Sequence, residues 1–132
     1  MTAPFHITQS IYSEDVDQYG IVYHSNYLKY FERARTEWLL SKGLTLTQLI
    51  EENCCFVIRR ATIDFTRSLK LHDRFTIDCQ INNTTRTTLL FKQVITECNS
   101  NIISCEAEIK LVTINTEGKI IKIPTAIKDI LL

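Results

Sequence analysis

The stretch from Asp15 to Gly43, DVDQYGIVYHSNYLKYFERARTEWLLSKG, contains the longest helical pattern of the 132-residue sequence and decides its fold. Apolar residues recur there at steps of three and four and form one broad stripe: Tyr27, Phe31, Ala34 and Trp38, widened by Leu28, Tyr30 and Leu39. A helix with so broad a stripe must be covered on most sides, and no second helical pattern of similar length is present. The sequence therefore predicts a long helix packed against a β-sheet.

Both ends of this predicted helix carry recognisable signals. Ser25 or Asn26 can cap the start, and Gly43 can supply the left-handed residue that ends it. Arg35 falls on the apolar side of the helix, where an unpaired charge would be costly. Glu32, three residues earlier, is its expected partner.

Strand patterns surround the helix. Phe5, Ile7 and Ile11 alternate with polar residues and predict a first strand, and Thr45 with Gln48 forms a capping box that opens a short helix. Four further strands are predicted, with a bulge at Arg59–Arg60 and a turn running from Asn82 to about Arg86; they cover residues 54–65, 74–81, 88–97 and 103–111. After a turn near Gly118 only a tail with a short apolar end is expected.

This order of elements predicts an α+β fold in which a five-stranded antiparallel sheet wraps around one long central helix. We expect residues 1–132 to form a single domain. An open sheet leaves its edge strands exposed, and pairing with another subunit is a common remedy. The chain is therefore expected to be a homodimer or a homotetramer built from dimers.

Composition excludes several classes of protein. The 15 basic and 15 acidic residues give a net charge of zero, so nucleic acid is not an expected partner. The N-terminal segment lacks the features of a signal peptide and no apolar run is long enough for a membrane span, so a cytoplasmic location is expected. The five cysteines show no C-x-x-C spacing, and we expect buried, reduced thiols rather than a disulfide framework or a metal site.

The hinge before the helix carries the motif that points to a function. The run D-x-x-G-I-V-Y-H-x-N-Y begins at Asp17, and E-R-A-R-T-E follows at Glu32. Together they resemble hotdog-fold acyl-CoA thioesterases of the 4-hydroxybenzoyl-CoA thioesterase type, and most of all the Tol-Pal-associated, YbgC-like subfamily. That subfamily often has a second tyrosine where this chain has Ser13, so no catalytic role is carried over to that position.

The resemblance implies that Asp17 is the catalytic carboxylate of an acyl-CoA thioesterase. It would act as a nucleophile or as a general base for water, and the sequence does not choose between the two. A thiol with a pKa of about 8.5 leaves readily as thiolate, so a carboxylate can suffice without a strong general acid. Glu14 and Asp15 match no catalytic position and are expected to stabilise the turn or to be solvated.

Other site residues follow from the same motif. Gly20 permits a tight bend or close approach of the substrate. In the family, the backbone N–H at the position of His24 polarises the thioester carbonyl, and the His24 imidazole is a candidate to orient water or hand a proton to the sulfur. Tyr23 and Tyr27 are expected to form the pocket wall.

The phosphates of coenzyme A need donors as well. Arg86, Thr87 and Thr88 resemble a nucleotide-contacting segment of the family, and Arg59 and Arg60 are weaker candidates. Such a site should lie between subunits. No metal and no bound cofactor are expected, since coenzyme A is part of the substrate, and an acyl-carrier-protein thioester is a second candidate substrate.

Three alternatives compete with this interpretation. A hotdog dehydratase would show a His-Phe-Pro signature, which is absent. A hotdog domain that only binds acyl-CoA or acyl carrier protein is disfavoured by Asp17. A ligand-binding domain of the nuclear-transport-factor type usually begins with helices, whereas this chain begins with a strand pattern.

Overall fold

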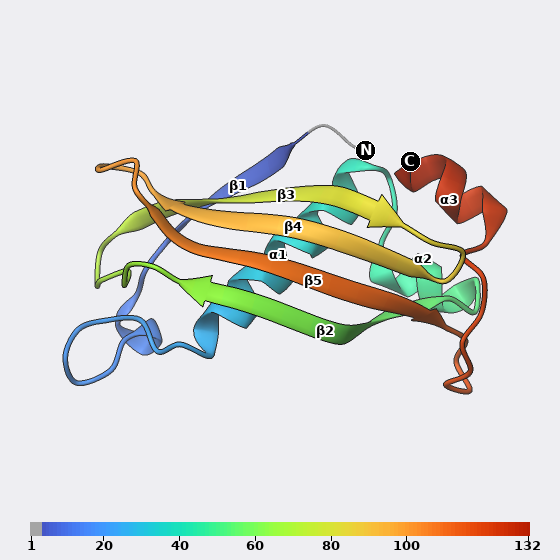
Figure 1. Cartoon of the computed structure of the whole chain (residues 1–132), viewed down its shortest axis with the longest axis horizontal. Helices are drawn as coiled ribbons and strands as arrows, with labels where there is room; N and C mark the ends of the chain where they lie inside the picture. Colours follow the sequence, from blue (N-terminus) through green and yellow to red (C-terminus); the bar gives the residue numbers. More distant parts are fainter. Residues whose placement is uncertain (1–3) are drawn as a thin grey trace.

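The structure, a computed structural model, describes residues 4–132 and shows one antiparallel sheet lying across a central helix (Figure 1). The α+β architecture expected from the sequence is confirmed. In chain order the elements are β1 (Phe5–Ser10), a 3-10 turn η1 (Ser13–Asp15), α1 (Asn26–Ser41), α2 (Leu46–Glu51), β2 (Cys55–Phe65), β3 (Arg74–Thr84), β4 (Thr88–Glu97), β5 (Ile103–Ile114) and α3 (Thr125–Leu131).

The five strands follow the order β1-β3-β4-β5-β2, so β1 and β2 are the edges of the sheet. The register of β2 against β5 shifts between Ile58 and Arg60, which confirms the predicted bulge. A second shift, between Ile81 and Asn83, lets β3 continue to Thr84. The turn predicted to begin at Asn82 was therefore placed too early, because the asparagines belong to a bulge within the strand.

The core lies between α1 and the sheet. Trp38 and Phe31 are fully buried, and the Trp38 ring meets Phe91 of β4 edge to face at a centroid distance of 5.3 Å. Burying an aromatic or aliphatic side chain of this size contributes roughly 1.5–3 kcal/mol. Leu28, predicted to widen the apolar stripe, is instead 40% exposed, because it points away from the sheet side of the helix.

The ends of α1 differ in how they are held. Gly43 has φ +83° and closes the helix as predicted. Ser25 occupies the cap position at the start, but its side chain makes no capping hydrogen bond. The capping box of α2 is confirmed, since Thr45 and Gln48 exchange hydrogen bonds of 2.8 and 3.0 Å.

Within residues 4–132 the predicted ion pair of Arg35 with Glu32 is not formed. Burial lowers the pKa of the Arg35 guanidinium, and the charge of Glu32 acts to raise it. Arg35 is 7% exposed, and its Nη1 donates to Oε1 of Gln93 on β4 at 2.9 Å. Gln93 in turn donates from Nε2 to the backbone carbonyl of Phe31 at 2.9 Å. Glu32 accepts hydrogen bonds from Thr36 instead.

Helix α3 was not predicted from the sequence. It begins after Pro124 and lies at the end of the sheet where β3 ends (Figure 1). Ile127 and Leu131, one turn apart, are buried and belong to the hydrophobic core. The short apolar end of the chain is therefore a part of the core rather than a loose tail.

The prediction of buried thiols holds for Cys54, Cys79 and Cys105, which are buried and free. Burial raises the pKa of Cys54 to about 11 and that of Cys105 to about 12. Cys98 departs from the prediction, because it lies exposed after the last residue of β4.

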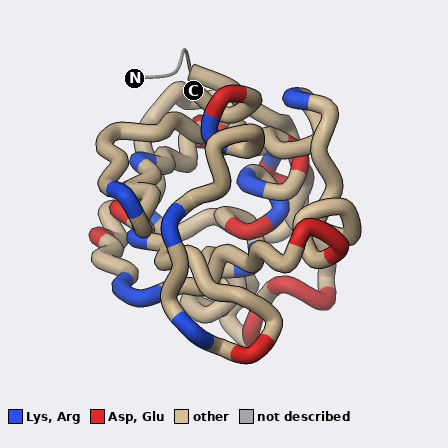
Figure 2. Tube along the Cα trace, turned by 90° about the vertical axis from the view of Figure 1, so that its right-hand side faces the viewer, with Lys and Arg blue, Asp and Glu red and all other residues tan. Residues whose placement is uncertain are grey.

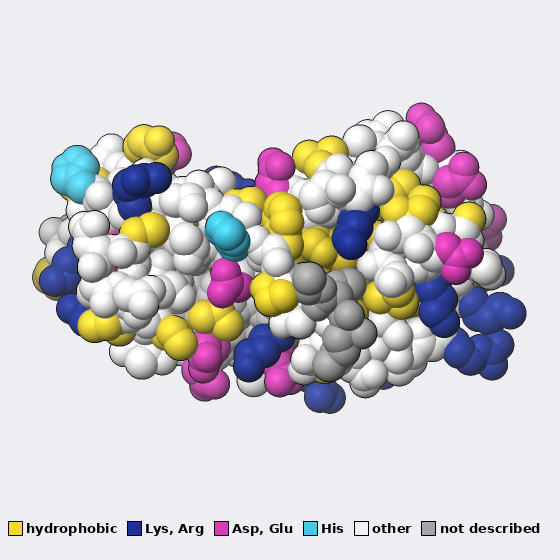
Figure 3. Space-filling model, turned by 90° about the horizontal axis from the view of Figure 1, so that it is seen from above, with side chains coloured by type: hydrophobic (Ala, Val, Ile, Leu, Met, Phe, Trp, Pro, Cys, Tyr) yellow, Lys and Arg dark blue, Asp and Glu magenta, His cyan; other side chains and the backbone are white. Residues whose placement is uncertain are grey.

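Residues of both charge signs lie on the faces of the molecule that the figures show. Acidic and basic segments are interspersed on the end of the molecule shown in Figure 2, which fits the net charge of zero. Seen from above, the surface again mixes both signs and is hollowed near its middle, where hydrophobic side chains are visible (Figure 3). No helix within residues 4–132 is long and apolar enough to cross a membrane.

Candidate active site

The chain between η1 and α1 forms a tight turn that presents Asp17. Val16 and Val22 form an isolated bridge, and the Asp17 N–H donates to the carbonyl of Ile21 at 2.9 Å. The Gly20 N–H donates to the carbonyl of Asp17 at 3.0 Å, and Gly20 has φ +76°. An L-residue adopts this conformation only at a cost, so glycine is what allows the turn to close.

The Asp17 carboxylate is half-buried and accepts one hydrogen bond among the described residues. Its Oδ1 accepts the backbone N–H of Tyr19 at 2.8 Å, the local contact that aspartate often makes in turns. Within residues 4–132 no lysine, arginine or histidine forms an ion pair with it. Its second oxygen is therefore available to a substrate or a water molecule.

The start of α1 offers unused donors. The N–H groups of Asn26 and Tyr27 donate to the carbonyls of Tyr23 and His24. In the described part of the chain, the N–H groups of His24 and Ser25 have no acceptor. They lie at the positive end of the helix dipole, where a developing negative charge is favoured.

Asp17 and the helix start line one cavity of about 320 Å³. Four residues predicted from the motif meet there: Asp17, Tyr23, His24 and Tyr27. Tyr23 and His24 are exposed, and their rings are in contact with centroids 4.6 Å apart and planes tilted by 39°. Tyr27 is buried, and its hydroxyl accepts the Leu69 N–H at 3.1 Å, which makes it a wall that joins α1 to the segment after β2.

The cavity also has a side that the sequence did not reveal. Phe65 and the residues 66–68 after it complete the lining. The Phe65 ring meets Tyr27 edge to face at 5.4 Å, and Arg67 adds a cation to the rim. These residues belong to no recognisable motif. Only their position at and after the end of an edge strand could have indicated that they line the cavity.

Arg86 and Thr87 lie in the turn between β3 and β4, and Thr88 is the first residue of β4, at the opposite end of the sheet from Asp17 (Figure 1). Arg86 is exposed, whereas Thr88 is buried and its hydroxyl is 2.6 Å from that of Thr85. Within one protomer these residues are not part of the Asp17 cavity.

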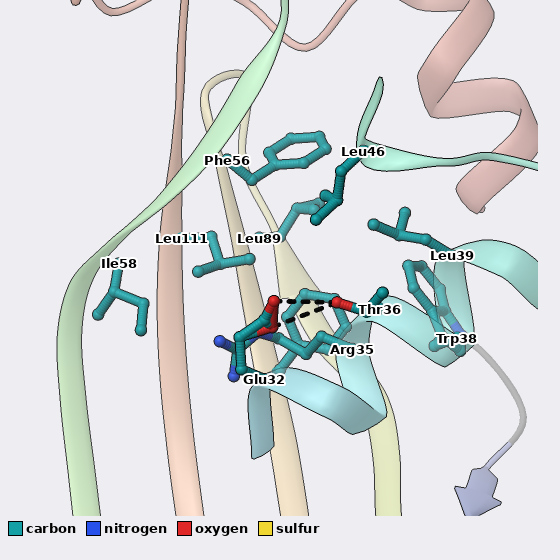
Figure 4. Close-up of a pocket in the computed structure, with 11 residues that line it drawn as sticks. Glu32, Arg35, Thr36, Trp38, Leu39, Leu46, Phe56, Ile58, Leu89 and Leu111 are labelled. Carbon is teal, nitrogen blue, oxygen red and sulfur yellow. Dashed lines mark hydrogen bonds between the residues drawn. The ribbon is translucent and has the colours of Figure 1, made fainter. Parts of the chain in front are cut away.

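A second cavity, of about 220 Å³, lies at the other end of α1, between that helix and strands β2, β4 and β5 (Figure 4). Its walls are largely apolar, with Arg35, Glu32 and Thr36 on the helix side. The apolar lining consists of Trp38, Leu39, Leu46, Phe56, Ile58, Leu89, Phe91 and Leu111.

No group of three or more His, Cys, Asp or Glu side chains within residues 4–132 is placed to hold a metal ion. The candidate site formed by the described residues therefore contains the Asp17 carboxylate, the free N–H and the imidazole of His24, and the Arg67 guanidinium. These groups can activate water or attack a carbonyl while the helix start stabilises the oxyanion.

Comparisons with known proteins show the family to which the chain belongs. The model of the thioesterase-like superfamily matches residues 13–131. Over 105 residues the chain is 33% identical to the acyl-CoA thioester hydrolase YbgC of Escherichia coli, which covers 80% of this chain and 78% of that protein.

Solved structures confirm the hotdog fold. A protein of Aquifex aeolicus has a TM-score of 0.90 and 28% identity, covering 97% of this chain and 99% of the other. A 4-hydroxybenzoyl CoA thioesterase in complex with 4-hydroxybenzoyl CoA has a TM-score of 0.89 at 17% identity, over 98% of this chain and 99% of the other.

Proposed function

The chain belongs to the thioesterase-like superfamily, and from this premise we propose that it hydrolyses acyl-CoA thioesters to a free acid and coenzyme A. The observation that carries the proposal is the cavity that Asp17 and His24 line together, with the His24 N–H, just before α1, unpaired among the described residues. A thioester needs these two elements, a nucleophile or base and an oxyanion donor, and little else.

The carbonyl oxygen of the thioester would accept the N–H of His24. A preorganised donor of this kind is typically worth about 2.7–4 kcal/mol in the transition state. Asp17 would either attack the carbonyl carbon to form an anhydride or take a proton from the attacking water. In both routes the C–S bond breaks and coenzyme A leaves as a thiolate. In the first route water then hydrolyses the anhydride, which releases the free acid and restores the Asp17 carboxylate.

The remaining motif residues would shape this reaction. The His24 imidazole, exposed at the cavity, is placed to orient water or to protonate the departing sulfur. Tyr23 and Tyr27 would form the wall, since the Tyr27 hydroxyl already accepts a backbone N–H. Gly20 would set the direction from which Asp17 enters the cavity.

We further propose that the active form is a dimer joined through β2. This edge strand exposes Val57 by 39%, Ile58 by 48% and Phe65 by 53%, and a free strand edge offers unpaired backbone groups to a second strand. Antiparallel pairing of two β2 strands about a twofold axis sets the Phe65 end of one protomer beside the Cys55 end of its partner. A tetramer would form from two such dimers.

That pairing would complete the substrate site from two protomers. Phe65 lines the Asp17 cavity, whereas Phe56 and Ile58 line the apolar cavity, so the two kinds of cavity would meet across the twofold axis. The apolar cavity of the partner would receive the acyl group. The partner's Arg86, with Thr87 and Thr88, would then lie on the Asp17 side and be available to the phosphates of coenzyme A.

Steady-state hydrolysis of a short, a long and an aromatic acyl-CoA, and of an acyl-carrier-protein thioester, tests the activity. Asp17→Asn should lower kcat by more than tenfold, or about 1.4 kcal/mol, since an amide is neither nucleophile nor base at neutral pH. Glu14→Gln is the matched control, because Glu14 is an exposed acid in the neighbouring 3-10 turn and should leave kcat unchanged.

Two outcomes would contradict the proposal. Binding of acyl-CoA without turnover by the wild type would make the chain a binding protein. Turnover that survives Asp17→Asn would remove Asp17 from the chemistry.

A further inference from the structure

The two halves of the proposed site belong to different elements. Asp17 lies in the turn of residues 16–22, whereas the donor N–H groups lie at the start of α1. Catalysis at such a site requires that the carboxylate and the donors keep a fixed separation. The contacts that join the turn to the helix therefore matter as much as the reacting groups.

One side chain makes such a contact. Nδ2 of Asn26, the first residue of α1, donates to the backbone carbonyl of Asp15 at 2.8 Å. The same carbonyl accepts the N–H of Tyr23 at 3.1 Å. Asp15 is held on its other side as well, because its carboxylate accepts the Tyr12 N–H at 2.8 Å. Asp15 precedes Asp17 by two residues and is thus tied directly to the helix start.

This contact also corrects the role expected from the sequence. Asn26 was a candidate cap for α1, yet its amide reaches back across eleven positions to the turn. A cap would serve only the helix. A bond to the Asp15 carbonyl serves the relation between the turn and the helix.

We propose that Asn26 is a positioning residue that fixes Asp17 relative to the N–H donors at the start of α1. The inference rests on the proposed thioester hydrolysis at Asp17. The side chain at this position must supply a hydrogen-bond donor of this reach, since the partner is a carbonyl oxygen. A carboxylate of the same size would instead place two acceptors against each other.

The proposal predicts that loss of the Asn26 hydrogen bond lowers kcat much more than it lowers the free energy of unfolding. A single hydrogen bond of this kind makes a modest net contribution to folding. A displacement of about 1 Å in a reacting group can lower the rate by about a hundredfold. The effect on kcat should therefore far exceed the effect on unfolding, and KM should change little.

The experiment is a double-mutant cycle with the isosteric variant Asn26→Asp and with Asp17→Asn, measured as kcat and KM on the best acyl-CoA substrate. Asn26→Asp alone should lower kcat by about 30-fold or more, with KM within about threefold. In the Asp17→Asn background the same change should cost less than about threefold, because no carboxylate remains to be positioned.

Asn53 provides the control. Its Oδ1 accepts the N–H and the hydroxyl of Thr116 at 2.8 and 2.7 Å. Asn53 therefore also joins two segments of the chain, the one that follows α2 and the one that follows β5. Asn53→Ala should lower the urea midpoint and leave kcat unchanged. If Asn26→Asp does not fold, Asn26→Ser, whose side chain is too short to reach Asp15, replaces it in the same cycle.

Three results separate the possibilities. If Asn26→Asp changes kcat no more than Asn53→Ala, or if its effect multiplies fully with that of Asp17→Asn, the positioning role is wrong. If Asp17→Asn by itself leaves kcat unchanged, it is the proposed function that fails. A large loss from Asp17→Asn with a non-additive Asn26→Asp supports both.

Discussion

We expect Gly20 to act on the candidate site through the backbone of the turn that carries Asp17. With φ +76° and no heavy atom within 4 Å of where a Cβ would stand, its only constraint is the backbone conformation. Gly20→Ala should therefore lower the free energy of unfolding by about 1 kcal/mol through conformational strain alone. It should also lower kcat several-fold, because relief of the strain would shift Asp17.

Gly118→Ala is the matched control for this change. Gly118 has φ +84° and equally open surroundings, but it lies in the turn after β5. Urea denaturation should show a similar loss of stability for both variants, with kcat reduced only by Gly20→Ala. Equal effects on kcat would mean that Gly20 acts through general stability and not through the turn.

At the residue scale, the sequence predicted those parts of the cavity that lie close together in the chain. Asp17, Tyr23, His24 and Tyr27 belong to one continuous motif and line one cavity. Arg67 was not predicted, because it lines that cavity from the segment that follows β2, far from the motif in the sequence. A contact that depends on how a strand ends leaves no local pattern to recognise.

Among the elements, α1 and β4 are joined by a buried polar contact centred on Gln93. Gln93→Leu would leave the buried Arg35 guanidinium without its acceptor and the Phe31 carbonyl without its donor. Leaving a buried polar group without its hydrogen-bond partner typically costs about 1–3 kcal/mol, and more where the group is charged. We expect a loss of that order in the free energy of unfolding, measured by urea denaturation.

The double variant Arg35→Met with Gln93→Leu tests the cause. Removing both partners also removes the unpaired charge, so the double variant should be more stable than Gln93→Leu alone. A double variant that is less stable than Gln93→Leu would contradict this account and would indicate that packing, not charge, accounts for the loss.

The same contact shows what local patterns can predict about elements. Helix α1 and most strand positions were predicted because burial imposes periods of 3.6 and 2 along the chain. The partner of Arg35 was predicted wrongly, since Glu32 is near in sequence whereas Gln93 lies 58 positions away. Helix α3 was missed because seven residues contain only two buried positions, too few to show a period.

At the scale of the whole molecule, the proposed dimer makes a direct prediction. Ala61→Arg adds a third positive charge beside Arg59 and Arg60 on the exposed edge strand β2, and a twofold axis would set it against its own copy. Like charges across paired strands are destabilising. Sedimentation should therefore show a shift of this variant from a multiple of 15.3 kDa toward the monomer mass, with loss of activity.

Thr8→Arg is the control on the other edge of the sheet. Thr8 is exposed on β1, so the same charge added there should change neither mass nor activity. A wild-type protein that is monomeric at micromolar concentration and fully active would remove the need for a partner. In that case the substrate site would have to be complete within one chain.

The strand order has a further consequence, for the time course of folding. Strands β3, β4 and β5 are consecutive in the chain and are joined by short turns. Strand β1 can pair only after β3 is present, since Phe5 pairs with Cys79. On the ribosome the N-terminal strand emerges long before its neighbour is synthesised. Contacts between distant parts of a chain form slowly. We therefore expect the turn that carries Asp17, which lies between β1 and α1, to be among the last segments to fold, after β3, β4 and β5 have paired.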